Sequence, residues 1–230
     1  MNDSQSHVDA EANSPTNRPD PGDSPWSPLQ NKVFSAILIA TIVSNIAFWT
    51  QNVASSWLMT TLTPSPLLVA LMQTAASLPI FLVGLIAGAL ADVIDRRKLL
   101  LATMVWTLLV ALALGILTLL GMISAWHLLA FTFLLGLGGA LNTPAWLAVM
   151  TELVEPREVP SAVTLHATGF NLARAIGPVL GGFMVAALGP AAVFLMNAGL
   201  FLYTLIVLFR WQSTRVVSST PTEDMLEAIT

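Results

Sequence analysis

Ala162 to Leu188 reads AVTLHATGFNLARAIGPVLGGFMVAAL, a stretch of apolar and small residues whose only Lys, Arg, Asp or Glu is Arg174. Spanning the hydrocarbon core of a bilayer takes about 20 consecutive, mainly apolar residues. Because lipid satisfies no backbone hydrogen bonds, such a stretch must be helical. The sequence contains five others: residues 33–57, 67–90, 99–120, 126–149 and 191–210. We therefore predict an all-α membrane protein with six transmembrane helices.

The composition of the whole chain agrees with this fold class. Of its 230 residues, 55% are hydrophobic and 10% are charged, and the mean hydropathy is +0.76, whereas a soluble domain has about 25% charged residues. The chain has no cysteine, and its three histidines are scattered, so neither a metal site nor a cofactor is predicted. The net charge of −4 comes mainly from acids in the two tails and gives no reason to expect nucleic-acid binding.

The basic residues predict the orientation of the spans. Eight of the nine Lys and Arg side chains lie before span one, between spans two and three, between four and five, or after six. The opposite connections, residues 60–65, 121–125 and 189–190, contain no Lys, Arg, Asp or Glu. Since short loops rich in Lys and Arg stay in the cytoplasm, both termini are expected there.

This topology divides the chain into three parts. Residues 1–31 are polar and rich in Asp, Ser, Asn and Pro, and we expect a disordered cytoplasmic tail. Residues 32–211 form the predicted six-helix bundle. Residues 212–230 are interpreted as the start of a cytoplasmic linker.

Arg174 is the strongest candidate for function because it lies deep in a span. It is about 12 residues from the cytoplasmic start, which places it roughly 18 Å into the bilayer. A buried Arg costs at least about 2.5 kcal/mol there, so it should face the bundle interior. We predict that it attracts an anionic group of a substrate or takes part in switching, with a fixed hydrogen-bonding role as the alternative. Asn171 shares its helix face.

Other residues at membrane depth have two interpretations each. Asn45 and Gln51 in span one could line a polar pathway or bond across helices. Gly177, Pro178, Gly181 and Gly182 predict a kink with tight helix packing, or close packing without movement.

Proton coupling has one local candidate. Proton coupling usually needs a titratable group in the membrane, and no predicted span contains an embedded Asp or Glu. His166, about one turn into span five, could titrate near neutral pH or only form a hydrogen bond.

The connection between spans two and three resembles the gating loop of the major facilitator superfamily. That loop has a glycine, an Asp and a basic pair, which Gly88, Asp92, Arg96 and Arg97 match. Val93 stands where a basic residue is often found and Asp95 where a glycine precedes the pair, which predicts a rewired charge network.

Span five resembles motif C of drug:proton antiporters in the same superfamily. Gly177, Pro178, Gly181 and Gly182 match, although Ala173 replaces a common glycine. Finer features resemble the bacterial secretion-effector branch, which includes enterobactin exporters: Ser44-Asn45, residues 61–67, Pro144-Ala145-Trp146 and residues 171–174. The resemblance covers residues 30–211.

The resemblance implies a fold and a function. The fold is the N-terminal half of a twelve-span transporter in the bacterial inner membrane, and the function is efflux of a small molecule, with a proton as a possible partner, by alternating access. The other half, or a second copy of the chain, would be the missing partner. A transport-incompetent fragment and a dimerising half-transporter are the alternatives. A membrane-bound enzyme is not expected, because no nucleophile, base and acid occur at suitable spacing. The substrate and the coupling ion are not specified.

Overall fold

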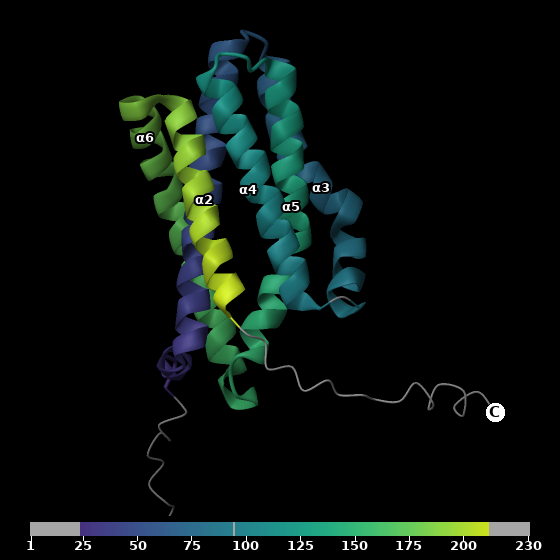
Figure 1. The fold of residues 1–230 in the computed structure, drawn as a ribbon, viewed down its shortest axis with the longest axis vertical. Helices are drawn as coiled ribbons and strands as arrows, with labels where there is room; N and C mark the ends of the chain where they lie inside the picture. The colour runs from purple at the N-terminus through teal and green to yellow at the C-terminus, as the bar shows by residue number, and fades with distance from the viewer. Residues whose placement is uncertain (1–23, 94, 212–230) are drawn as a thin grey trace, which may run out of the picture.

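In the computed structural model, which describes residues 24–93 and 95–211, every predicted span lies within a helix to within one residue, and five long helices contain the six spans (Figure 1). The elements are η2 Ser27–Gln30, α2 Lys32–Leu62, α3 Pro66–Val93, α4 Arg96–Leu119, α5 Ala125–Glu152, η3 Pro156–Glu158 and α6 Val159–Arg210. These described residues contain no strand. Five of the helices are long and apolar enough to cross a membrane.

The last helix, α6, contains both the fifth and the sixth predicted spans. Its backbone leaves helical dihedral angles at Gly189, where φ is 79° and ψ is 165°. A positive φ is cheap only for glycine, and the next residue is Pro190, whose ring prevents a regular helix from continuing through this point. Gly189 therefore divides α6 into residues 159–188 and residues 190–210.

The two parts of α6 run in opposite directions along α2. In the first part, Gly169 faces Ile42 and Gly181 faces Thr50, so residues 159–188 run parallel to α2. In the second part, Asn197 bonds to Thr50, whereas Thr204, further along the chain, bonds to the carbonyl of Ala40, nearer the start of α2. Residues 159–210 thus form a helical hairpin against α2, seen in Figure 1 as adjoining green and yellow segments.

Small residues on the first part of α6 allow this close approach. A Cβ atom added to Gly177 would overlap the Cβ of Trp49, and one added to Gly181 would lie 3.0 Å from the Cα of Thr50. By contrast, a Cβ at Gly182 would meet nothing within 4 Å. Glycines that let backbones come together are typical of helix contacts in membranes.

Polar side chains cap the first turns of α2 and α4. The Asn31 side-chain oxygen accepts a hydrogen bond of 2.9 Å from the amide of Val33, and its amide group donates to the carbonyl of Leu153 at 2.8 Å. Asp95 caps α4 through the amides of Arg97 and Lys98. The short helix η2 occupies the end of the segment expected to be a disordered tail, while residues 1–23 and the expected linker at 212–230 lie outside the described residues.

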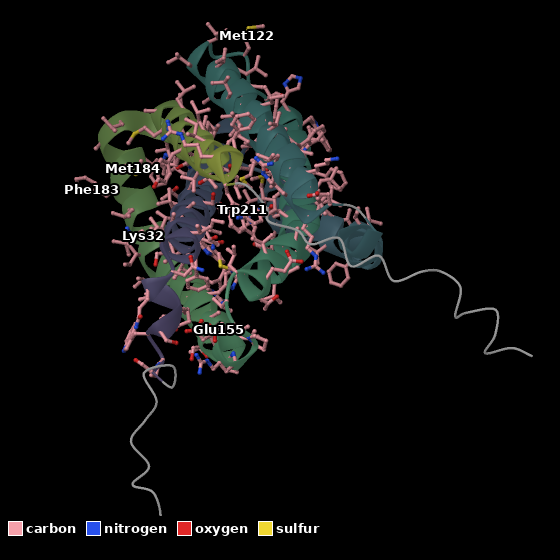
Figure 2. All side chains as sticks on the ribbon, turned by 60° about the horizontal axis from the view of Figure 1, so that its bottom comes forward. Lys32, Met122, Glu155, Phe183, Met184 and Trp211 are labelled. Carbon is pink, nitrogen blue, oxygen red and sulfur yellow. The ribbon has the colours of Figure 1, made fainter. Side chains whose placement is uncertain are left out.

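Two clusters of buried apolar side chains fill the bundle, one toward each end. One cluster is centred on Phe34, Leu100, Val149 and Leu208 near the Asn31 end. The other is centred on Met59, Leu114, Leu128 and Phe194. Large apolar side chains also cover the outside, such as Phe183 at 74% exposure, which projects from the green part of α6 in Figure 2. An apolar exterior around an apolar core fits a lipid environment.

Candidate functional site

Two hollows lie along the face of α2 that is turned toward α3 and α5. The first, the α2–α3 groove, has a volume of about 700 Å³. The second, the central cavity, has a volume of about 290 Å³ and is lined by all five long helices. Phe48, Ala76 and Ile80 line both hollows and therefore separate them. The larger hollow is of a size that binds drug-like molecules.

The central cavity brings together two of the predicted site residues. Asn45 on α2 and His166 on α6 both line it, and both are partly buried. Neither side chain makes a hydrogen bond or an ion pair to the residues whose side chains the structure describes, so the polar atoms of both are free to meet a ligand or water. Aromatic rings of Phe48 and Phe170 complete this part of the wall.

The wall of the central cavity also contains polar residues that sequence reasoning did not assign to a site. Asn142 lines it from α5, and its side-chain oxygen accepts a hydrogen bond of 3.1 Å from the hydroxyl of Thr103. Trp146 and Thr143 lie on the same stretch of α5. The signal in the sequence that could have identified this part of the wall is the amide of Asn142, followed by Thr143 and a proline, within a predicted span.

Gln51 and Asn171 lie outside both hollows. Gln51 is only 4% exposed, and its side-chain oxygen accepts a hydrogen bond of 2.9 Å from Asn197 on the second part of α6. Asn171 is exposed, and its amide donates to the carbonyl of Ala167 on its own helix at 3.0 Å. Gln51 therefore contributes to helix packing here, and the pathway role of both residues stays a prediction.

Arg174 lies against an aromatic ring on α2. Its guanidinium carbon is 5.7 Å from the centre of the Trp49 ring, a cation–π distance. Trp49 also makes edge contacts with Phe48 and Phe170, with ring centres 5.7 and 6.3 Å apart. Trp49 lines the α2–α3 groove. The sequence singled out Arg174 and predicted that it faces the bundle interior. In the described bundle its side chain is instead exposed and lines neither hollow. Its contact with Trp49 depends on how α2 and α6 pack.

The predicted kink residues at the middle of α6 are helical. Residues 177–182 keep helical structure, and Pro178 lines the α2–α3 groove. Within α6, non-helical dihedral angles occur at Gly189. Gly177 and Gly181 face α2 in the way that the packing interpretation expects, whereas Gly182 is exposed. Whether the segment bends during function stays a prediction.

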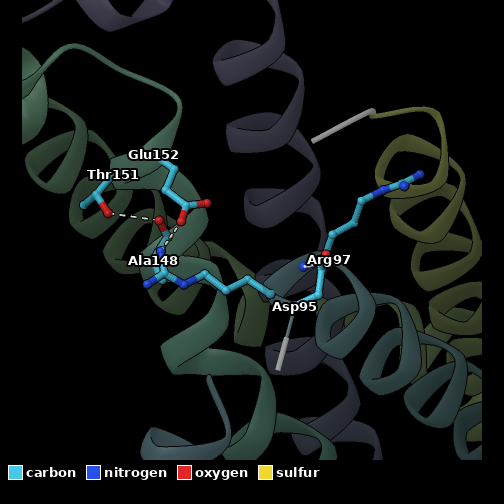
Figure 3. A network of polar contacts seen from close by, with 6 residues as sticks. Asp95, Arg97, Ala148, Thr151 and Glu152 are labelled. Atoms are coloured by element: carbon cyan, nitrogen blue, oxygen red, sulfur yellow. Dashed lines mark hydrogen bonds and ion pairs between the residues drawn. The ribbon is translucent and has the colours of Figure 1, made fainter. Parts of the chain in front are cut away.

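The basic pair of the predicted gating loop contacts two different helices. Arg96 forms an ion pair with Glu152 at the end of α5 (Figure 3). Arg97 points away from Glu152 in this view and donates a hydrogen bond of 2.8 Å to the carbonyl of Phe209 near the end of α6. A cation beside the last carbonyls of a helix is favoured by the helix dipole. The pair thus ties the start of α4 to the ends of α5 and α6.

The remaining members of that loop are only partly described. Gly88 and Asp92 lie in the last turns of α3, but the surroundings of these turns, including the Asp92 side chain, fall outside the described part of the structure. Glu152, which pairs with Arg96, was not predicted as a gate residue. The sequence signal that would have found it is an acidic residue just after a predicted span, on the same side as the basic pair.

Comparison with known proteins identifies the family. A family model described as transmembrane secretion effector, within the major facilitator superfamily, matches residues 23–230. The chain belongs to this family, which confirms the resemblance found in the sequence.

Three relatives match this chain with the same sequence identity. The uncharacterized MFS-type transporter YfiS of Bacillus subtilis is 27% identical over 77% of this chain and 42% of its own length. The staphyloferrin A transporter of Staphylococcus aureus is 27% identical over 65% and 38%, and the multidrug efflux pump Tap of Mycolicibacterium fortuitum is 27% identical over 75% and 43%. The chain thus spans about two fifths of the length of these relatives.

Proposed function

We propose that this chain forms one six-helix half of a secondary transporter that exports a small molecule by alternating access. The observation that carries the proposal is the central cavity, where Asn45 and His166 present free polar groups in the middle of an apolar bundle. Polar groups inside a membrane bundle are costly, and they commonly mark the pathway of a substrate or ion. Membership of the family, and relatives named for multidrug efflux and for staphyloferrin A transport, support the direction and the kind of solute.

The proposed topology has six crossings with both ends in the cytoplasm of a bacterial inner membrane. A straight helix as long as α6 would measure about 78 Å at about 1.5 Å per residue, more than twice the roughly 30 Å of a hydrocarbon core. The antiparallel arrangement of its two parts along α2 supports two crossings that turn at Gly189. Arg96, Arg157 and Arg210 then all lie on one side.

Residues at that cytoplasmic side form the proposed gate. Arg96 and Arg97 hold the ends of α5 and α6, and Gly88 and Asp92 would complete the loop against a second bundle. Breaking and remaking such surface ion pairs costs little, about 1 kcal/mol or less each. This low cost suits contacts that form in one state of an alternating-access cycle and open in the other.

A second six-helix bundle is the proposed partner, supplied either by further residues of the same protein or by another copy of this chain. The uncovered hollows along α2 and the share of the relatives that this chain matches support a partner on that face. His166 is the proposed site of proton coupling, because it is the titratable residue of the described chain that lines either hollow.

An accumulation assay tests the function. Cells making the protein as its gene encodes it, and cells without it, are loaded with a panel of siderophores, drugs and metabolites. We expect at least one compound to leave faster when the protein is present, and Arg174→Ala and Asp92→Asn to remove the difference. Arg157→Ala, which breaks only an exposed ion pair with Glu155, serves as the control and should export normally. No difference for any compound would contradict transport, and normal export by both site variants would contradict the site assignments.

A further inference from the structure

Arg174 is a cation at membrane depth without a counter-ion. Among the side chains that the structure describes, ion pairs join Arg96 to Glu152 and Arg157 to Glu155, and neither includes Arg174. Its guanidinium also donates no hydrogen bond to these residues, and its contact is the face of Trp49. A guanidinium has five donors in a planar fork that suits a carboxylate. The fork is therefore available to an anion.

Trp49 is held in a fixed place beside this cation. The backbone of α6 approaches it so closely at Gly177 that any side chain there would overlap the Cβ of Trp49. Its indole nitrogen is buried and has no acceptor among the described residues. Buried donors are nearly always paired, so an unpaired one beside a free guanidinium marks a place where an acceptor is missing.

The pair lies beside the α2–α3 groove, which Trp49 lines, whereas Arg174 is exposed and lines neither hollow. Phe170, four residues before Arg174, lines the central cavity, and Pro178, four residues after it, lines the α2–α3 groove. Residues four apart share a helix face, so Arg174 lies on the face of α6 that carries these two lining residues. Aromatic rings of Phe48 and Phe170 stand edge-on to Trp49 and frame the same place.

We propose that Arg174 and Trp49 form a binding platform for a planar aromatic carboxylate, which is the substrate class of this transporter. The carboxylate pairs with the guanidinium fork, and the aromatic ring of the ligand packs among Phe48, Trp49 and Phe170. A groove of about 700 Å³ beside the platform accommodates the rest of a drug-sized molecule. This inference rests on the proposed function, because it assigns the solute of the same pathway.

The test is binding, measured separately from transport. The protein as its gene encodes it is placed in lipid nanodiscs, and 4-fluorobenzoate is titrated while its fluorine NMR line is followed, with empty nanodiscs subtracted. We expect saturable broadening that benzoate reverses. Cyclohexanecarboxylate keeps the charge without the flat ring, and benzamide keeps the ring without the charge. Each should compete at least about tenfold more weakly than benzoate, the factor that corresponds to losing one good interaction.

Variants connect the binding to the two residues. Arg174→Gln should abolish saturable binding, and Arg174→Lys, which keeps the charge but not the fork, should weaken it about tenfold. Trp49→Leu should weaken it as well, and Trp49→Phe less. The controls are Arg157→Gln and Trp126→Leu, which are exposed and line neither hollow. Folding of each variant is checked by circular dichroism, so that loss of binding is read only from folded protein.

The possible outcomes separate this inference from the proposed function. Binding by Arg174→Gln equal to that of the unmodified protein would overturn the platform, and equal competition by cyclohexanecarboxylate would overturn the planar ligand. Absence of saturable binding to the unmodified protein would overturn the inference. If Arg174→Gln then also lowers the thermal unfolding temperature, the counter-ion of Arg174 is a carboxylate of the second bundle. Export without benzoate binding leaves the transport function standing, whereas benzoate binding without export of any compound contradicts transport alone.

Discussion

The side-chain amide of Asn197 donates a hydrogen bond of 2.9 Å to the side-chain oxygen of Gln51 in the apolar interior of the bundle. The oxygen of Asn197 accepts a second bond, of 3.0 Å, from the hydroxyl of Thr50. The three residues are 0%, 4% and 2% exposed. This network fixes the second part of α6 against α2, since moving either helix would leave polar groups without partners.

Replacing Asn197 by alanine should therefore destabilise the fold. The change leaves Thr50 and Gln51 buried with fewer partners, and we expect the free energy of unfolding to fall by about 1 to 2 kcal/mol. Unfolding in mixed detergent micelles, followed by circular dichroism, measures it. Asn171→Ala is the matched control, because that exposed amide bonds only to its own helix and should change stability by less than about 0.5 kcal/mol. Equal stability of the two variants would show that the network does not hold α6.

The same network shows what the sequence could and could not predict. Hydropathy predicted where the helices lie, because each one must supply an apolar stretch of membrane thickness. Gln51 was predicted to line a pathway, yet its partner is 146 residues away in the sequence, and no periodicity within either span indicates that contact.

The Arg174 pair has the same limitation. A deep arginine is visible in one span, but its neighbour Trp49 follows from the register between α2 and α6, which the glycine contacts determine. Likewise, the turn at Gly189 was predicted as a loop of two residues, and the structure retains nearly continuous helix around it. Long-range packing, rather than local propensity, accounts for both details.

Two neighbouring glycines in α6 should respond differently to the addition of one methyl group. Gly177→Ala would force the Cβ of residue 177 into Trp49, and overpacking of this kind costs about 1 to 3 kcal/mol of stability. Gly182→Ala meets open space and should be neutral or slightly stabilising, since alanine favours a helix by up to about 1 kcal/mol. Both are compared by the detergent unfolding assay. A loss of stability in Gly182→Ala as large as that in Gly177→Ala would contradict the packing of α6 on α2.

The ion pair between Arg96 and Glu152 should contribute little to stability. Its side chains are 26% and 37% exposed, and partly exposed pairs are worth about 0.2 to 1 kcal/mol. A double-mutant cycle with Arg96→Gln and Glu152→Gln should give a coupling energy in that range, which falls when salt is raised to about 1 M. Arg97→Gln with Glu152→Gln is the control cycle, since Arg97 bonds to Phe209 instead, and it should show no coupling. Coupling that salt does not reduce would mean that the pair is buried in the assembled protein.

Single cysteines can determine whether α6 crosses the membrane twice. The chain has no cysteine of its own, so each introduced thiol reports one position. In intact cells, a membrane-impermeant maleimide should label Ser65→Cys, Met122→Cys and Leu188→Cys, because these positions lie in, or directly beside, connections that carry no Lys or Arg and are expected outside. Lys98→Cys and Arg157→Cys should be labelled only after the cells are opened. Labelling at 188 with protection at 157 fits a turn at Gly189, whereas equal protection at 157 and 188 would mean that the chain between them does not cross the bilayer and that the six-span topology fails.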